Sequence, residues 1–290
     1  MFGSGYICPC CGSSHWVKKI SLPSYLFSRS ADIIVCSVCA LGATWPPPTS
    51  DYDYYQQNQQ YVDSFSEKSA LFYQFAEKML DNLQGVVNMS GKRLLDIGCG
   101  LGFLVEAAAR HGIISEGIEA NSNLVSRSIS RGLNVSCSTI ENLKKDGRKY
   151  DFIVFSSVLE HLVHPDIIIQ SCKDLLNEGG IIIASQAAYD GLLPNVFPWG
   201  WYGWQPKEHY WHFSLRSFFH LAEKSGLRVI SYSKDSLYHP YFAHGGLKVL
   251  IGRNIAAVIA RFGKIINKGD SFIILFEIAS GSQIAFTQAT

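Results

Sequence analysis

The chain has 290 residues, of which 47% are hydrophobic, so it is long enough for one large domain and a small additional module. Its 25 Lys and Arg residues balance 24 Asp and Glu residues, which excludes a general basic surface for nucleic acid. The pattern of a secretion signal and an apolar run long enough to cross a membrane are both absent, so we expect a cytoplasmic protein. Most of the eight cysteines lie near the N-terminus, which in reducing cytosol favours metal binding over disulfides.

Four of these cysteines form two C-x-x-C pairs: Cys8, Cys11, Cys36 and Cys39. The segment between the pairs is short enough to fold back as a β-hairpin, and four thiolates complete the tetrahedral coordination of a structural Zn²⁺. Residues 1–45 are therefore predicted to form a small zinc ribbon. Cys10 is an alternative to Cys11, although the two-residue spacing favours Cys11. His15 in place of one cysteine, and a set of merely buried or redox-active thiols, also remain open.

Residues 46–63 change abruptly in composition and predict a linker, because three prolines precede a segment rich in Tyr, Gln and Asn. Its tyrosines lie either on the surface or over a binding cleft. Ser64 and Glu67 then match a capping box, and the apolar residues that follow at helical spacing predict a helix to about Leu83. Residues 64–290 are predicted to form the main domain.

A glycine-rich turn follows the first predicted buried strand of this domain, residues 94–97, and precedes a predicted helix over residues 103–110. A strand, a glycine turn and a helix are the parts of a nucleotide-binding site, because glycine lets the backbone approach a ligand closely. The spacing is G-x-G-x-G, with Phe103 where a dinucleotide-binding fingerprint has its third glycine, so a pyrophosphate ligand is disfavoured. Glu119 ends the next predicted strand, 114–118, where a carboxylate can bind both hydroxyls of an adenosine ribose. Alternatively, Glu119 is only an acid at the start of a helix.

These residues resemble the class I S-adenosylmethionine-dependent methyltransferase family. Residues 96–102 match its first motif, Glu119 its second, and residues 150–161 its fourth-strand region, while the zinc module is similar to one in a subgroup of the family. The resemblance implies that Asp96 and the glycine turn hold the methionine end of S-adenosylmethionine, Glu119 the ribose, and Thr139 with Ile140 the adenine. Many members have an acid where Thr139 stands. The residues predicted to line the cofactor site are Asp96, Gly98, Cys99, Gly100, Gly102, Glu119, Thr139, Ile140 and Ser156.

The rest of the chain alternates predicted strands (134–137, 151–155, 181–185 and 227–233) with predicted helices (165–176 and 215–225). This alternation predicts an α/β fold with a doubly wound, mainly parallel sheet. By the resemblance, the sheet is Rossmann-like and seven-stranded, and residues 271–278 form its antiparallel strand. Ligands of such sheets bind beyond the carboxyl ends of the strands, which is where Asp96, Glu119, Ser156 and His161 are expected.

Residues 186–213 are predicted to form a long loop rich in tryptophan and tyrosine, which is either a lid over the acceptor pocket or a structural cap. A dry aromatic pocket favours methyl transfer, because the sulfonium and the nucleophile both lose charge in the reaction. An alcohol acceptor also needs a base, and His161, His209 and His212 are the candidates. Each histidine has an alternative structural role.

Residues 241–268 predict a basic amphipathic insertion. Ile255, Ile259, Phe262 and Ile266 share one helical face. Residues 247–268 therefore either contact a membrane or phosphate groups, or form an ordinary surface helix.

The predicted function is methylation of a small molecule, at a hydroxyl of a sugar, glycan precursor or related metabolite, with S-adenosylmethionine as donor and Zn²⁺ as a structural ion. One alternative is an RNA base methyltransferase with a zinc module, but the even charge of residues 1–60 argues against a nucleic-acid partner. A second is a catalytically silent zinc-ribbon scaffold, and a third is a dehydrogenase. The sequence does not indicate the oligomeric state.

Overall fold

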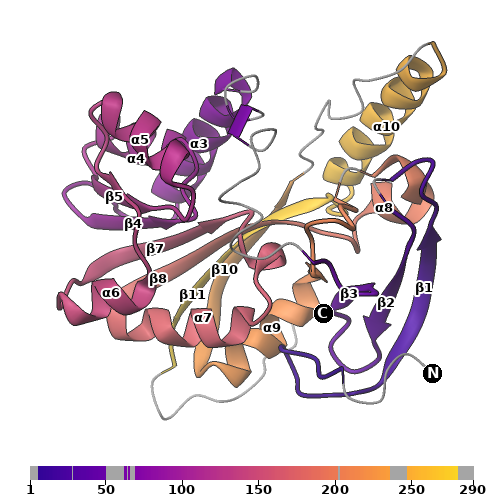
Figure 1. Ribbon diagram of the computed structural model, residues 1–290, viewed down its shortest axis with the longest axis horizontal. Coiled ribbons are helices and arrows are strands. Elements are labelled where there is room, and N and C mark those ends of the chain that lie inside the picture. The colour runs from indigo at the N-terminus through magenta and orange to yellow at the C-terminus, as the bar shows by residue number, and fades with distance from the viewer. Residues whose placement is uncertain are drawn as a thin grey trace.

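The computed structural model describes residues 6–27, 29–49, 62, 63, 65, 69–201, 203–235 and 247–279, without the side chains of residues 200 and 247–254. A seven-stranded sheet lies between helices, and a four-stranded sheet stands beside it (Figure 1). Within the described residues, none of the helices combines the length and hydrophobicity that a membrane span requires.

The large sheet has the strand order β10-β11-β8-β7-β4-β5-β6. Its strands are β4 (Arg93–Ile97), β5 (Ile114–Ile118), β6 (Val135–Ser136), β7 (Tyr150–Ser156), β8 (Leu176–Ala187), β10 (Leu227–Asp235) and β11 (Ser271–Ile278). Strands β4 to β8 are mutually parallel, whereas β11 runs antiparallel to both β8 and β10. The sequence prediction of a seven-stranded, Rossmann-like methyltransferase sheet is therefore confirmed.

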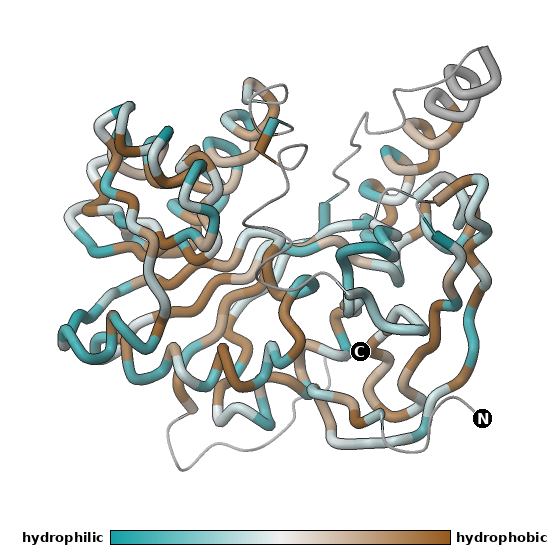
Figure 2. The backbone as a smooth tube through the Cα atoms, viewed as in Figure 1, coloured by the Kyte–Doolittle hydropathy of each residue, from teal (hydrophilic) through white to brown (hydrophobic). Residues whose placement is uncertain are grey.

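Helices cover both faces of this sheet. Figure 1 shows α3 (Ser69–Gln84), α4 (Phe103–Arg110) and α5 (Ser122–Ser130) on one side, and α6 (Ile140–Lys145), α7 (Pro165–Cys172) and α9 (Leu215–Lys224) on the other. Successive side chains of β4 point to opposite faces of the sheet, because side chains alternate along a strand, and so they pack against the two layers of helices in turn. Leu94 packs in a cluster with Leu80 and Leu104, whereas Leu95 packs with Ile169. The apolar residues along the central strands are visible in Figure 2.

The small sheet has the order β1-β2-β3-β9 and is antiparallel throughout. Strands β1 (Trp16–Leu22), β2 (Ala31–Cys36) and β3 (Gly42–Trp45) come from the predicted zinc ribbon. The fourth strand, β9 (Trp211–His212), comes from the predicted lid and pairs with β3. The N-terminal sheet thus includes residues from both sides of the boundary predicted at residue 45, and that boundary stays a prediction.

Several predicted elements differ in detail. Residues 186–213 are not one loop, because β8 continues to Ala187 and is followed by α8 (Leu192–Val196), the 3₁₀ turn η3 (Pro198–Gly200) and β9. The helix predicted over 165–176 ends at Cys172 and continues as the 3₁₀ turn η2 (Lys173–Leu175). The first long helix begins at Ser69, while Ser64, Glu67, residues 50–61 of the linker and residues 241–246 lie outside the described residues.

Candidate functional site

The strand order reverses between β4 and β7, and ligands of such sheets bind at this point, beyond the carboxyl ends of the strands. The glycine turn lies at this point. Gly98, Gly100 and Gly102 have φ angles of +69°, +55° and +72°, a region that other residues adopt at a cost. A Cβ on Gly100 would lie 2.5 Å from the ring of Phe65, so an aromatic side chain that precedes α3 covers the turn.

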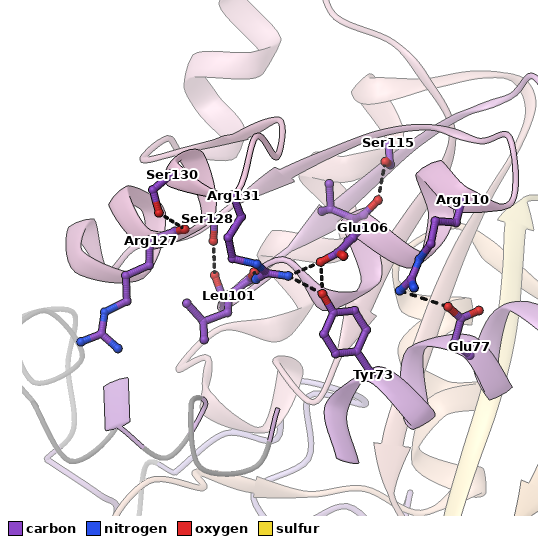
Figure 3. A network of polar contacts seen from close by, with 12 residues as sticks. Tyr73, Glu77, Leu101, Glu106, Arg110, Ser115, Arg127, Ser128, Ser130 and Arg131 are labelled. Carbon is purple, nitrogen blue, oxygen red and sulfur yellow. Dashed lines mark hydrogen bonds and ion pairs between the residues drawn. The ribbon is translucent and has the colours of Figure 1, made fainter. Parts of the chain in front are cut away.

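Arg131 holds the far end of this turn in place (Figure 3). Its Nη1 donates to the Leu101 carbonyl at 2.6 Å, and its Nη2 forms an ion pair with Glu106 of α4. The hydroxyl of Tyr73, on α3, donates to the same Glu106 carboxylate. Helices α3 and α4 and the end of α5 are therefore tied to the turn through one guanidinium group, which fixes the backbone that a cofactor would meet.

Two buried carboxyl groups lie beside the turn. Glu119 accepts a hydrogen bond from the Gly100 backbone N–H at Oε2 and another from the Asn121 N–H at Oε1, both at 2.9 Å. Burial raises the pKa of Glu119, and burial together with the charge of Glu119 raises the pKa of Asp96 well above its usual value. Two acids held near each other out of water form a strongly electronegative pocket. Such a pocket suits ribose hydroxyls and a cationic ligand.

The other predicted cofactor residues have different surroundings. Cys99 packs its sulfur against Gly117 of β5, at 2.6 Å from an ideal Cβ there. Thr139 is exposed and its hydroxyl accepts from the Asn142 N–H, so it caps α6, while Ile140 is buried in the core. Ser156 is exposed at the end of β7. Contacts between these four residues and a cofactor stay predictions.

A second polar group lies immediately beyond the glycine turn. The side chain of Val158 is 2.8 Å from the place where a Cβ on Gly98 would stand, and the 3₁₀ turn η1 (Leu159–His161) follows it directly. Glu160 and His161 are therefore only two and three residues beyond the side chain that contacts the cofactor turn.

The three predicted base candidates lie together in this region. The rings of His161 and His209 are nearly perpendicular with centroids 4.6 Å apart, and His212 is 6.1 Å from His209. Burial lowers the pKa of His161 to about 4 and of His212 to about 3, and it lowers that of His209 well below its usual value. All three imidazoles are neutral at neutral pH.

Sequence reasoning missed Glu160. Its side chain is 3% exposed, and burial raises its pKa to about 7 although a hydrogen bond from Gln186 opposes the shift. Among the described residues, no donor reaches its Oε2 atom. A buried polar atom without a partner is uncommon and calls for an explanation. Its place beside His161 in the segment Val158-Leu159-Glu160-His161 was the available signal.

The predicted aromatic lid is largely a packed core. Trp201, Trp204 and Trp211 are 1 to 3% exposed, whereas Trp199 is 53% exposed. Trp201 and Trp204 pack with Tyr189 and with Ala260 of α10 (Leu247–Ile265). Glu160, Gln186, Trp201, Trp211 and His212, among others, line a gap beside the cluster that is too narrow to hold a water molecule. Most of this segment fits the alternative of a structural cap.

Helix α10 has apolar residues on its exposed side as well as on the side that faces the core. Ala256 and Ala260 face the tryptophan cluster, while Val258 and Phe262 are 64% and 54% exposed. Of the predicted apolar face, Ile255 and Ile266 are also exposed, whereas Ile259 packs against the tryptophan cluster, so only part of that face contacts the core. In Figure 1 the helix projects from the body of the protein. Contact of this helix with a membrane or phosphate groups stays a prediction.

The N-terminal cysteines meet as predicted. The sulfurs of Cys8, Cys11, Cys36 and Cys39 all lie within 4.8 Å of one another. Cys8 and Cys39 are 3.4 Å apart and Cys11 and Cys36 are 3.5 Å apart, whereas sulfurs at 2.3 Å from a tetrahedral Zn²⁺ lie about 3.8 Å apart. The four thiols therefore fit a closed structural zinc site. The Cys10 thiol contacts Cys8 and Cys39 but, like His15, is not one of the four mutually close ligands.

The fold and the cofactor pocket together define the class of this protein. A seven-stranded sheet with one inserted antiparallel strand, a glycine turn at the switch point and an acid at the end of the next strand are the features of class I methyltransferases. The chain belongs to the methyltransferase-domain family, whose model matches residues 69–232.

Relatives in sequence have names that agree with this family. Residues of this chain are 33% identical over 112 positions to a ubiquinone biosynthesis O-methyltransferase of Coxiella burnetii, covering 37% of this chain and 48% of the relative. A protein of the same name from Glaesserella parasuis is 43% identical over 106 positions, covering 33% and 45%. The match thus spans about half the length of these curated relatives.

Solved structures show the same fold at low sequence identity. A SAM-dependent methyltransferase of Thermotoga maritima is 18% identical with a TM-score of 0.52, covering 75% of this chain and 95% of the other. The plantazolicin methyltransferase BpumL, solved with SAH, is 12% identical with a TM-score of 0.53, covering 79% and 94%.

Proposed function

We propose that this protein is an S-adenosylmethionine-dependent methyltransferase that methylates a hydroxyl group of a small molecule. The observation that carries the proposal is the position of Glu119, which two backbone N–H groups hold beside Asp96 and the left-handed glycine turn. Each carboxylate oxygen of Glu119 keeps acceptor capacity for a ribose hydroxyl. When bound, S-adenosylmethionine supplies an electrophilic methyl group on a sulfonium.

The acceptor side supports an oxygen nucleophile. The neutral imidazoles of His161, His209 and His212 lie together, His161 follows the turn-contacting Val158 by three residues, and a hydroxyl acceptor needs a group that takes its proton. The tryptophans around them exclude water, which favours a reaction that disperses charge. The sequence relatives are named O-methyltransferases, which agrees with an oxygen acceptor. The acceptor that we propose is a sugar, a glycan precursor or a related metabolite. A phenol, which the name of the relatives suggests, is the substrate for comparison.

Calorimetric titration with S-adenosylmethionine tests the donor. Glu119→Gln keeps the size of the side chain and removes its charge, so we expect the dissociation constant to rise at least about tenfold. Glu116→Gln is the matched control, because Glu116 is a buried acid on the same strand that pairs with Arg148 instead. Absence of saturable binding to the natural chain, or an equal loss in both variants, would refute the proposal.

Three comparisons separate the alternatives. A silent scaffold predicts no saturable heat with S-adenosylmethionine, and a dehydrogenase predicts tighter binding of NAD. An RNA methyltransferase predicts RNA affinity that falls steeply with salt. Transfer of a labelled methyl group to a panel of sugars and phenols then identifies the acceptor class, and methylation of RNA alone would contradict our choice.

A further inference from the structure

Glu160, His161 and His209 form a cluster that the methyltransferase fold itself does not require. One carboxylate oxygen and one ring nitrogen from each histidine lie within 4.8 Å of one another. Glu160 and His161 belong to the turn after β7, whereas His209 lies just before β9, so two distant segments bring these groups together. The cluster is separate from the four N-terminal cysteines.

Both histidines are oriented by backbone carbonyl groups. His209 Nδ1 lies 3.0 Å from the Gly203 carbonyl oxygen, which can only accept, so Nδ1 carries the proton. His161 hydrogen-bonds the Glu208 carbonyl in the same way. A neutral imidazole that donates a hydrogen bond from one nitrogen has a lone pair on the other. Metal-binding histidines characteristically donate their other N–H to a backbone carbonyl or a carboxylate.

Glu160 supplies the independent observation. The side chain of Glu160 is only 3% exposed, and among the described residues no donor reaches its Oε2 atom. The hydrogen-bond partners that its carboxylate does have, the Gln186 side chain and the Glu160 backbone N–H, are both neutral. A buried carboxylate is costly unless a cation or several donors compensate it, and a divalent ion at this position would do so.

We propose that Glu160, His161 and His209 bind a divalent transition-metal ion. Two imidazoles and one carboxylate suit ions of the series Fe²⁺ to Zn²⁺ and leave further coordination positions open. Ligand atoms at about 2.1 Å from one ion are at most about 4.2 Å apart. The three ligand atoms lie within 4.8 Å of one another, so a shift of at most about 0.6 Å brings them within that limit.

The position of the metal site suggests a role for the ion in methyl transfer, and this role rests on the proposed function. The cluster follows Val158, whose side chain contacts the cofactor turn at Gly98. An acceptor hydroxyl coordinated in an open position would be more acidic than a free one, since a bound metal ion lowers the pKa of a coordinated oxygen. The substrate class is then an oxygen ligand for the metal, such as a phenol or diol, and His212 remains beside it for the released proton.

Titration with Co²⁺ of protein that carries only one equivalent of Zn²⁺ tests the site without any cofactor or acceptor. The Zn²⁺ occupies the four cysteine thiolates, which bind it more tightly than they bind Co²⁺. Co²⁺ with nitrogen and oxygen ligands gives weak visible bands, without the intense charge-transfer bands of thiolate ligands. We expect saturable binding of a single Co²⁺ with nitrogen and oxygen character. Glu160→Gln and His161→Ala should each weaken it at least about tenfold.

His111→Gln is the control, because His111 pairs with Glu77 at 2.7 Å on the surface and forms another histidine–carboxylate pair. Its Co²⁺ spectrum and affinity should equal those of the natural chain. The inference is overturned if only thiolate bands appear, if nothing saturates, or if Glu160→Gln, with an unchanged circular dichroism spectrum, binds as tightly as the natural chain. Since S-adenosylmethionine is absent, this failure would leave the proposed function untouched, and failure of donor binding would leave the metal site untouched.

Discussion

Thr44 joins the small sheet to the histidine cluster, and its hydroxyl allows a quantitative test. Thr44 is fully buried, donates to the His209 carbonyl at 2.7 Å and lies 2.9 Å from His212 Nε2. A hydroxyl has a single proton, so His212 Nε2 must donate to it. Thr44→Val keeps the shape but leaves a buried carbonyl and a buried N–H without their partner, at about 1–3 kcal/mol each. The free energy of unfolding should fall by about 2–6 kcal/mol.

Scanning calorimetry measures this effect. For a chain of this size about 1 kcal/mol shifts the thermal midpoint by 2–4 °C, so Thr44→Val should melt at least about 4 °C lower. Thr44→Ser is the matched control, since it keeps the hydroxyl and loses one methyl group, at a cost of about 1 kcal/mol. If serine destabilises the protein as much as valine does, packing rather than the hydrogen bonds holds this junction, and the reasoning fails.

Two further changes test the cofactor turn and the cysteine cluster. Burial raises the pKa of Asp96, so its charged form destabilises the fold increasingly as pH rises above the usual 3.8. Asp96→Asn should therefore raise the melting temperature of the cofactor-free protein more at pH 8 than at pH 4.5, while it weakens S-adenosylmethionine binding; an equal or opposite shift at the two pH values would contradict this. Cys11→Ser should lose bound zinc by metal analysis, whereas Cys10→Ser should keep it, because Cys11 is one of the four mutually close sulfurs and Cys10 contacts only two of them. Equal zinc contents would show that the ligand assignment is wrong.

The elements that local sequence patterns determine were predicted well. The helix at residues 103–110 and the strands at 114–118 and 271–278 have the predicted bounds, because glycine turns and continuous apolar runs delimit them. The C-x-x-C spacing likewise predicted which sulfurs meet.

What the sequence could not show depends on contacts between distant segments. A two-residue strand such as β9 has no periodicity, and its pairing with β3 follows only from the folded arrangement. For the same reason, two of the tryptophans that suggested an open lid, Trp201 and Trp204, are buried between the small sheet and α10. Glu160 showed no pattern beyond its neighbour His161, because its unusual state results from burial by residues from other elements.

The pairing of β3 with β9 means that the N-terminal sheet cannot finish folding until β9 has been synthesised. Until Trp211 and His212 have been synthesised, the N-terminal sheet presents the backbone groups of β3 along an open edge. Unpaired edges are templates for association with other chains. A fragment of residues 1–45 should therefore bind zinc yet tend to aggregate, and the nascent ribbon needs either a chaperone or rapid synthesis of the catalytic domain to become a finished module.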